Sequence, residues 1–86
     1  MKIRFNHVLE AVQYKKASTL REYLSRTDER ISVYEVKNAD SVVVRIPYKD
    51  FLIEMFMGDW LIYDPVLDMF SAVPDDMFKL SFEVIQ

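Results

Sequence analysis

Five aspartates at predicted turns are the residues whose type and spacing come closest to a chemical site in this chain of 86 residues. Converging carboxylates bind Mg²⁺ or Ca²⁺, and a pair of them can perform acid–base chemistry. However, their spacing is not that of an EF-hand loop, and aspartate at turns is expected simply because its side chain bonds to nearby backbone N–H groups. The sequence therefore favours structural roles over a metal-dependent enzyme for this set: Asp59, Asp64, Asp68, Asp75 and Asp76.

Other residue types used in catalysis are scarce. The chain contains one histidine, His7, and no cysteine, which excludes thiol chemistry and the usual zinc arrangements. Its serines lie in no nucleophile motif, and a single histidine gives little support to a serine–histidine pair. We therefore expect no enzyme, no cofactor and no metal site.

Charge is divided unevenly along the chain, whose formal net charge is −3. Residues 1–49 hold ten lysines and arginines against six acids, whereas residues 50–86 hold Lys79 alone against eight acids. The acidic half could mimic DNA phosphate, but its acids are interleaved with core residues and the net charge is small. The basic residues near the predicted helix could contact nucleic acid, yet an isoelectric point near 5.0 argues against nucleic-acid binding as the main activity.

An almost continuous apolar run at 51–57 is the strongest indication of a contact surface. Either this strand is central and covered on both faces, or one face meets another protein, because methionine and aromatic residues are enriched at interfaces. We expect a protein partner or a second copy of the chain, bound through this run or through the acidic turns. The candidate partner-binding residues are Phe51, Ile53, Met55, Met57, Asp64, Asp68, Asp75 and Asp76.

Hydrophobic periodicity predicts one α+β domain over residues 1–86. Thr19 and Glu22 fit a capping box, which predicts one main helix beginning at 18 or 19. The strands and the helix predict a small, curved antiparallel sheet of six or seven short strands, with a short C-terminal helical turn at about 74–80. The expected strands are 8–14, 31–37, 41–48, 51–56, 60–63, 69–73 and 81–85.

Turn residues separate these strands. Asn38-Ala39-Asp40 indicates an antiparallel hairpin. Pro47 indicates either an edge strand or the end of strand pairing, because proline has no N–H to donate. Gly58 permits a positive φ, and Pro74 suits the first turn of a helix. The apolar runs are too short to cross a membrane and the N-terminus lacks a signal-peptide core, so the sequence predicts a cytoplasmic protein.

Short motifs in a fixed order resemble a family of small proteins carried by tailed phages and prophages. They are VLEAVQY at 8–14, GDWLI at 58–62, Phe70, and DMFKLSFE at 76–83. The chain departs from the family at Met57, where a proline is usual, and in the turn at 64–69, which lacks a glycine. The resemblance implies an accessory protein made in an infected bacterium and brings no catalytic residues with it.

Three functions follow as hypotheses. The first is a protein that binds a host or phage protein and modulates or inhibits it by occupying its surface. The second is a structural or self-assembling role in phage production, and the third is a metal-dependent enzyme that uses the turn aspartates. The scarcity of catalytic residue types favours the first hypothesis over the third.

Overall fold

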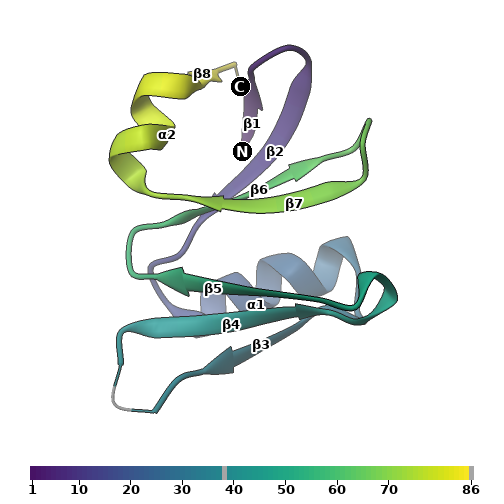
Figure 1. The fold of residues 1–86 in the computed structure, drawn as a ribbon, viewed down its shortest axis with the longest axis vertical. Coiled ribbons are helices and arrows are strands. Elements are labelled where there is room, and N and C mark those ends of the chain that lie inside the picture. The colour runs from purple at the N-terminus through teal and green to yellow at the C-terminus, as the bar shows by residue number, and fades with distance from the viewer. Residues whose placement is uncertain (38, 86) are drawn as a thin grey trace.

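The computed structural model describes residues 1–37 and 39–85. In chain order the elements are β1 (Lys2–Arg4), β2 (Val8–Gln13), α1 (Ala17–Thr27), β3 (Ser32–Glu35), β4 (Ser41–Ile46), the 3₁₀ helix η1 (Pro47–Lys49), β5 (Phe51–Phe56), β6 (Trp60–Asp64), β7 (Met69–Val73), α2 (Asp75–Ser81) and β8 (Glu83–Val84). Figure 1 shows their arrangement. Across the described ranges, no helix has the length and apolar character needed to cross a membrane.

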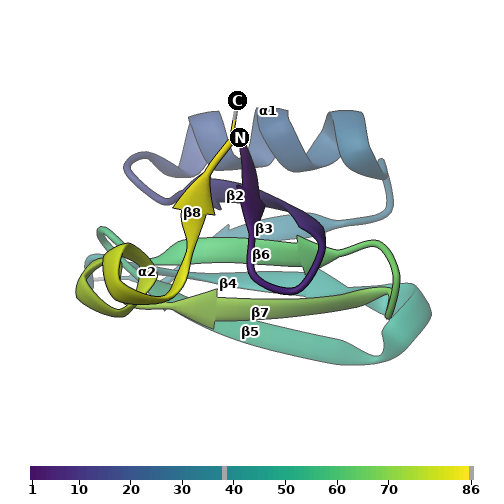
Figure 2. The same ribbon diagram turned by 90° about the horizontal axis from the view of Figure 1, so that it is seen from above.

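The α+β class is confirmed, but the strands form two antiparallel sheets rather than one. The five-stranded sheet has the order β7–β6–β2–β1–β8, and the three-stranded sheet has the order β3–β4–β5. The sheets separate because β2 pairs with the distant β6, with Gln13 opposite Trp60, while β3, β4 and β5 pair only with their chain neighbours. The sequence did not predict β1, which lies between β2 and β8 (Figure 1). In Figure 2 it is the purple strand that begins at the N-terminus, beside β8.

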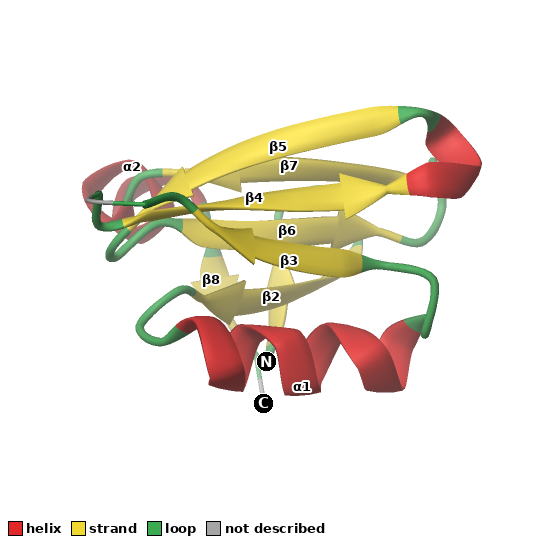
Figure 3. Ribbon diagram, turned by 90° about the horizontal axis from the view of Figure 1, so that it is seen from below, coloured by secondary structure: helices red, strands yellow, loops and turns green. Residues whose placement is uncertain are grey.

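The main helix is present, but the capping box predicted for it is wrong. α1 begins at Ala17, and its N-cap residue Lys16 makes no side-chain capping bond. Glu22 instead forms an ion pair with Arg26, one turn further along the helix. The buried side chains of α1 face the strands, and Figure 3 shows the helix running along one side of them. Packing of this apolar face, rather than a cap, therefore stabilises α1.

The turn predictions agree closely with the structure. β3 and β4 form the expected hairpin, although Asn38 in its turn lies outside the described residues. Pro47 ends β4 and begins η1, and Gly58 has a φ of 95° between β5 and β6. Pro74 is the N-cap residue of α2, immediately before the helix rather than within its first turn.

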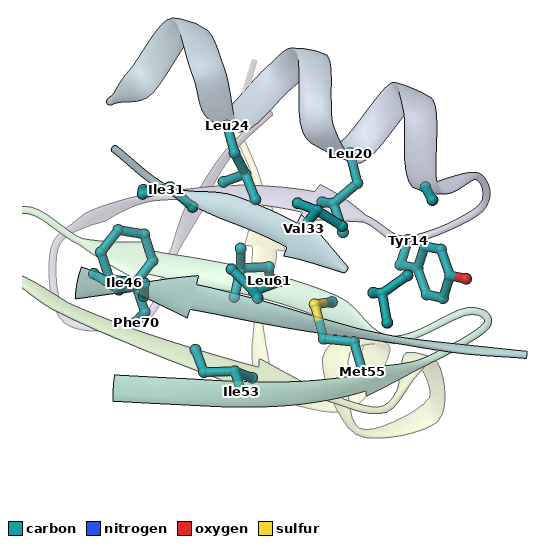
Figure 4. Close-up of a cluster of buried hydrophobic side chains, with 13 residues drawn as sticks. Tyr14, Leu20, Leu24, Ile31, Val33, Ile46, Ile53, Met55, Leu61 and Phe70 are labelled. Carbon is teal, nitrogen blue, oxygen red and sulfur yellow. The ribbon is translucent and has the colours of Figure 1, made fainter. Parts of the chain in front are cut away.

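Two apolar cores lie on opposite faces of the five-stranded sheet. β2 and β6 contribute to both, because successive side chains of a strand point to opposite faces. The smaller core packs α2 against the sheet and contains Ile3, Leu9, Ala11, Ile62 and Phe78. The larger core lies between α1 and the two sheets (Figure 4) and contains Tyr14, Ala17, Leu20, Leu24, Ile31, Val33, Val42, Val44, Ile46, Ile53, Met55, Leu61 and Phe70.

Candidate protein-binding site

The structure corrects the prediction for two of the candidate partner-binding residues. Ile53 is 7% exposed and Met55 is fully buried, and both belong to the larger core. Figure 4 shows their side chains pointing into this core from β5. Their apolar character is therefore explained by packing within the chain, and neither side chain is available to a partner.

The opposite face of β5 carries the apolar residues that sequence reasoning missed. Leu52 and Phe56 are more than half exposed, on either side of the exposed Glu54. The sequence contained a signal for these exposed residues. Glutamate is rarely buried in a core, and residues two positions away on a strand share its face. The outward face of β5 could have been identified from that one charged residue.

Phe51, Asp64 and Asp68 are brought to one end of the molecule, which we call the η1 end. Here η1 meets the turn between β6 and β7 through a salt bridge, with Lys49 Nζ 2.9 Å from Asp68 Oδ2. The Tyr63 hydroxyl donates a hydrogen bond of 2.9 Å to Asp68 Oδ1. The hydrogen bonds from Lys49 and Tyr63 hold the pKa of Asp68 below its usual value, so this carboxylate is charged at neutral pH.

A hollow of about 440 Å³ opens at the η1 end between the two sheets. Phe51 is 43% exposed and Met69 is 58% exposed, and these two residues come from neighbouring edge strands, β5 and β7. The turn that precedes Met69, between β6 and β7, adds two further exposed apolar side chains, Val66 and Leu67. The residues lining the hollow are Tyr48, Lys49, Phe51, Asp68, Met69 and Phe70.

The backbone of the η1 end adopts unusual conformations. Asp50 and Asp68 have φ values of 50° and 53°, and they are the two non-glycine residues with positive φ in residues 1–37 and 39–85. Aspartate tolerates this region better than most residues because its short side chain bonds locally. Such conformations persist only where neighbouring contacts enforce them, and they are frequent at binding sites.

Contacts from neighbouring loops hold the η1 end in place. The Arg30 guanidinium lies 4.3 Å from the ring centroid of Tyr48 and donates to Asp28, with Nη2 and Oδ2 2.7 Å apart. His7 Nε2 lies 2.7 Å from Asp64 Oδ1, which joins the β1–β2 loop to the β6–β7 turn. Burial opposes ionisation of Asp64, but hydrogen bonds from His7 and from backbone N–H groups outweigh it and lower the pKa of this carboxyl.

Asp75 and Asp76 lie at the opposite end of the β6–β7 hairpin, in α2. Met57 is 52% exposed after β5, where its N–H donates to the Asp40 carbonyl at 3.0 Å. Asp75 Oδ1 accepts a hydrogen bond of 2.9 Å from Trp60 Nε1 and one of 3.4 Å from Gln13 Nε2. The indole of Trp60 stacks on the ring of Phe78, with centroids 3.9 Å apart and planes inclined by 4°. Gln13 Nε2 also donates to the Gly58 carbonyl at 3.0 Å.

These five residues form one cluster, which we call the α2 anchor: Gln13, Gly58, Trp60, Asp75 and Phe78. Three of the motifs that carry the phage resemblance contribute to it, although they are far apart in the sequence. Its hydrogen bonds are all made within the chain, and hydrogen bonds from Trp60 and Lys79 lower the pKa of the Asp75 carboxyl. The α2 anchor therefore fastens α2 to the five-stranded sheet, and the motifs are explained by folding.

The turn aspartates do not converge on a single site. Asp64 and Asp68 lie at one end of the β6–β7 hairpin, and Asp75 lies at the other. Asp59 and Asp76 accept hydrogen bonds from the N–H groups of Phe56 and Met77, both at 2.9 Å, as expected for local turn and helix contacts. Within the described part of the chain, no three histidine, aspartate or glutamate side chains are grouped so that they could hold a metal ion.

No protein-family model, no curated protein and no solved structure matches the chain.

Proposed function

We propose that this chain is a phage- or prophage-encoded accessory protein that binds another protein, of the host or of the phage, and modulates or inhibits it by occupying its surface. It acts in the cytoplasm of the bacterial host, in a stoichiometric complex. This action needs no catalytic residue, cofactor or metal ion. The sequence motifs support the phage setting, and the η1 end supports the binding activity.

The observation that carries the proposal is the open hollow at the η1 end, with exposed apolar walls beside a salt bridge. Protein interfaces typically combine an apolar centre with a polar rim, and a few anchoring side chains supply most of the affinity. Phe51 and Met69 form the apolar walls, while Lys49 and Asp68 provide the polar edge. A partner inserting one apolar side chain into this hollow would cover groups that water otherwise surrounds.

The test begins with capture of partners from bacterial lysate by the tagged chain, followed by calorimetry with the purified partner. The variant Phe51→Ala/Met69→Ala removes both walls, and circular dichroism verifies that it is folded, as expected for two exposed side chains. We expect this variant to bind at least about tenfold more weakly, a loss of roughly 1.4 kcal/mol. Leu80→Ala is the matched control, since Leu80 is an exposed apolar residue of α2 at the other end of the molecule.

Two results would contradict the proposal. One is the absence of any stoichiometric partner, and the other is a partner that binds the double variant as tightly as the unchanged chain. A partner that is lost with Leu80→Ala but kept by the double variant would move the binding surface to α2.

A further inference from the structure

The outer face of the three-stranded sheet is a second exposed surface, separate from the η1 end. Most inward side chains of β3, β4 and β5 are buried in the larger core (Val33, Val42, Val44, Ile46, Ile53 and Met55), whereas the alternate side chains point away from α1. In Figure 1 this sheet lies in front of α1, so its outer face is turned toward the reader. The outward residues are Ser32, Tyr34, Val43, Arg45, Leu52, Glu54 and Phe56.

This face is mainly apolar. Tyr34, Leu52 and Phe56 are each more than half exposed, and Val43 lies between them on the central strand. Exposed apolar groups gathered on one face of a sheet mark an interaction surface more often than scattered single residues do. The nature of the partner is indicated by the charged residues that share the face.

Arg45 and Glu54 are the two charged residues that point outward from this sheet. Neither takes part in any ion pair formed by the described residues. Arg45 is opposite Leu52 and Glu54 is opposite Val43, so the two charges occupy diagonal positions on adjacent strands. The face thus carries one positive and one negative group, each exposed, at diagonal positions of adjacent strands.

A surface with this arrangement is complementary to itself. In an interface with two-fold symmetry the same patch is used by both copies, and each contact occurs twice. A two-fold axis that passes midway between Arg45 and Glu54, in the plane of the interface, places Arg45 of each copy opposite Glu54 of the other. Leu52 and Val43 occupy the other diagonal, close to this axis, and would meet their own counterparts.

We propose that the outer face of the three-stranded sheet binds a second copy of this chain, through two reciprocal Arg45–Glu54 ion pairs around an apolar centre of Val43, Leu52, Tyr34 and Phe56. Opposite charges across the interface set the register of the two sheets, and the apolar side chains supply the contact area. Binding of another protein at the η1 end does not depend on this contact.

The small size of the face limits the area that a dimer can bury. Three strands about 4.8 Å apart and roughly 20 Å long cover about 300 Å² in projection. A standard interface buries about 800 Å² on each partner, so this contact belongs to the small, transient class. The dimer is therefore weak, and its population rises steeply with protein concentration.

Sedimentation velocity over a range of concentrations, up to the millimolar range, tests the proposal. We expect the apparent mass to rise from the 10.2 kDa of one chain toward twice that value. Arg45→Glu and Glu54→Arg each place like charges opposite one another in the homodimer, and each should weaken association at least tenfold. Arg4→Glu reverses an exposed charge on β1, away from this face, and should associate like the unchanged chain.

Mixing the two variants is the decisive step. One variant then presents two acids and the other presents two arginines, so both contacts of the mixed dimer are complementary. We expect an equal mixture of Arg45→Glu and Glu54→Arg to associate as well as the unchanged chain, while each variant alone remains monomeric. Circular dichroism verifies that both variants are folded.

The proposal is overturned if the unchanged chain stays at 10.2 kDa at every concentration, or if the mixture associates no better than its components. Either result would leave the proposed function of the η1 end untouched, because Phe51 and Met69 differ from the two substituted residues, Arg45 and Glu54. Conversely, loss of partner capture with an intact dimer would contradict the proposed function alone.

Discussion

Trp60→Ala removes the centre of the α2 anchor and tests whether this cluster holds α2 on the sheet. The indole is half-buried, stacks on Phe78 and donates to Asp75. Truncation takes roughly 100–150 Å² of buried aromatic surface out of the fold, which corresponds to about 3 kcal/mol at ~25 cal/mol per Å². Loss of the stacked pair adds about 0.5–1.5 kcal/mol. We therefore expect Trp60→Ala to lower the free energy of unfolding by about 3.5–4.5 kcal/mol.

This loss is large for so small a chain. At roughly 0.05–0.15 kcal/mol per residue, a protein of this length has a total stability of about 4–13 kcal/mol. Each kcal/mol shifts the Tm of a domain of this size by about 4–8 °C, so the expected fall is roughly 14–36 °C. The assay is thermal and urea unfolding followed by far-ultraviolet circular dichroism, because Trp60 is the only tryptophan and fluorescence is lost with it.

Two further variants separate stacking from other causes. Leu80→Ala truncates an apolar side chain of α2 that is 84% exposed, and it should change stability by no more than about 0.5 kcal/mol. A double-mutant cycle with Phe78→Ala should give a coupling energy of about 0.5–1.5 kcal/mol, the value expected for an aromatic pair. If Trp60→Ala costs no more than Leu80→Ala, or if the cycle shows no coupling, the α2 anchor does not hold the helix and the reasoning fails.

Single substitutions at three other places should change the stability of the fold in distinct ways. Met55→Ala should cost about 2–5 kcal/mol in urea unfolding because Met55 is fully buried, whereas Leu52→Ala on the other face of β5 should change stability by less than about 0.5 kcal/mol. Gly58→Ala should cost about 1–2 kcal/mol in the same assay, since a Cβ meets no atom within 4 Å and the penalty comes from the φ of 95° alone. Side-chain and backbone hydrogen bonds from Arg30 lower the pKa of Asp28 to about 2. The ionised carboxylate therefore stabilises the fold fully above its pKa of about 3.9 in the unfolded chain, and this stabilisation is lost as pH falls through about 2. In thermal melts, Asp28→Asn should flatten that acid-side decline; an unchanged profile would show that the ion pair contributes nothing.

Local sequence patterns were sufficient to predict most of the helices and strands. Alternating apolar residues located β2 through β7, and turn residues located the ends of β4 and the break at Gly58. The capping box failed because Thr19 lies inside α1, which is positioned by burial of Leu20 and Leu24. β1 was missed because three residues are too few to show a period.

The candidate site was harder to predict, because membership of a core depends on what covers each face. In the run at 51–57 both faces of the strand carry apolar residues, and Glu54 alone indicates that Leu52 and Phe56 are exposed while Ile53 and Met55 are buried. The hollow at the η1 end combines residues of β5 and β7, which belong to different sheets. No local pattern records that these two edge strands are neighbours.

The amino-acid sequence by itself determined the α+β class, the approximate strands and turns, and the scarcity of catalytic residue types, because each depends on composition or on spacing within a few residues. Tertiary structure alone decided that the strands divide into two sheets, that Gln13, Trp60 and Asp75 meet, and that the turn aspartates lie at opposite ends. These features depend on pairings between distant segments, above all the pairing of β2 with β6. That pairing is stabilised by the burial of apolar side chains on both faces of the five-stranded sheet.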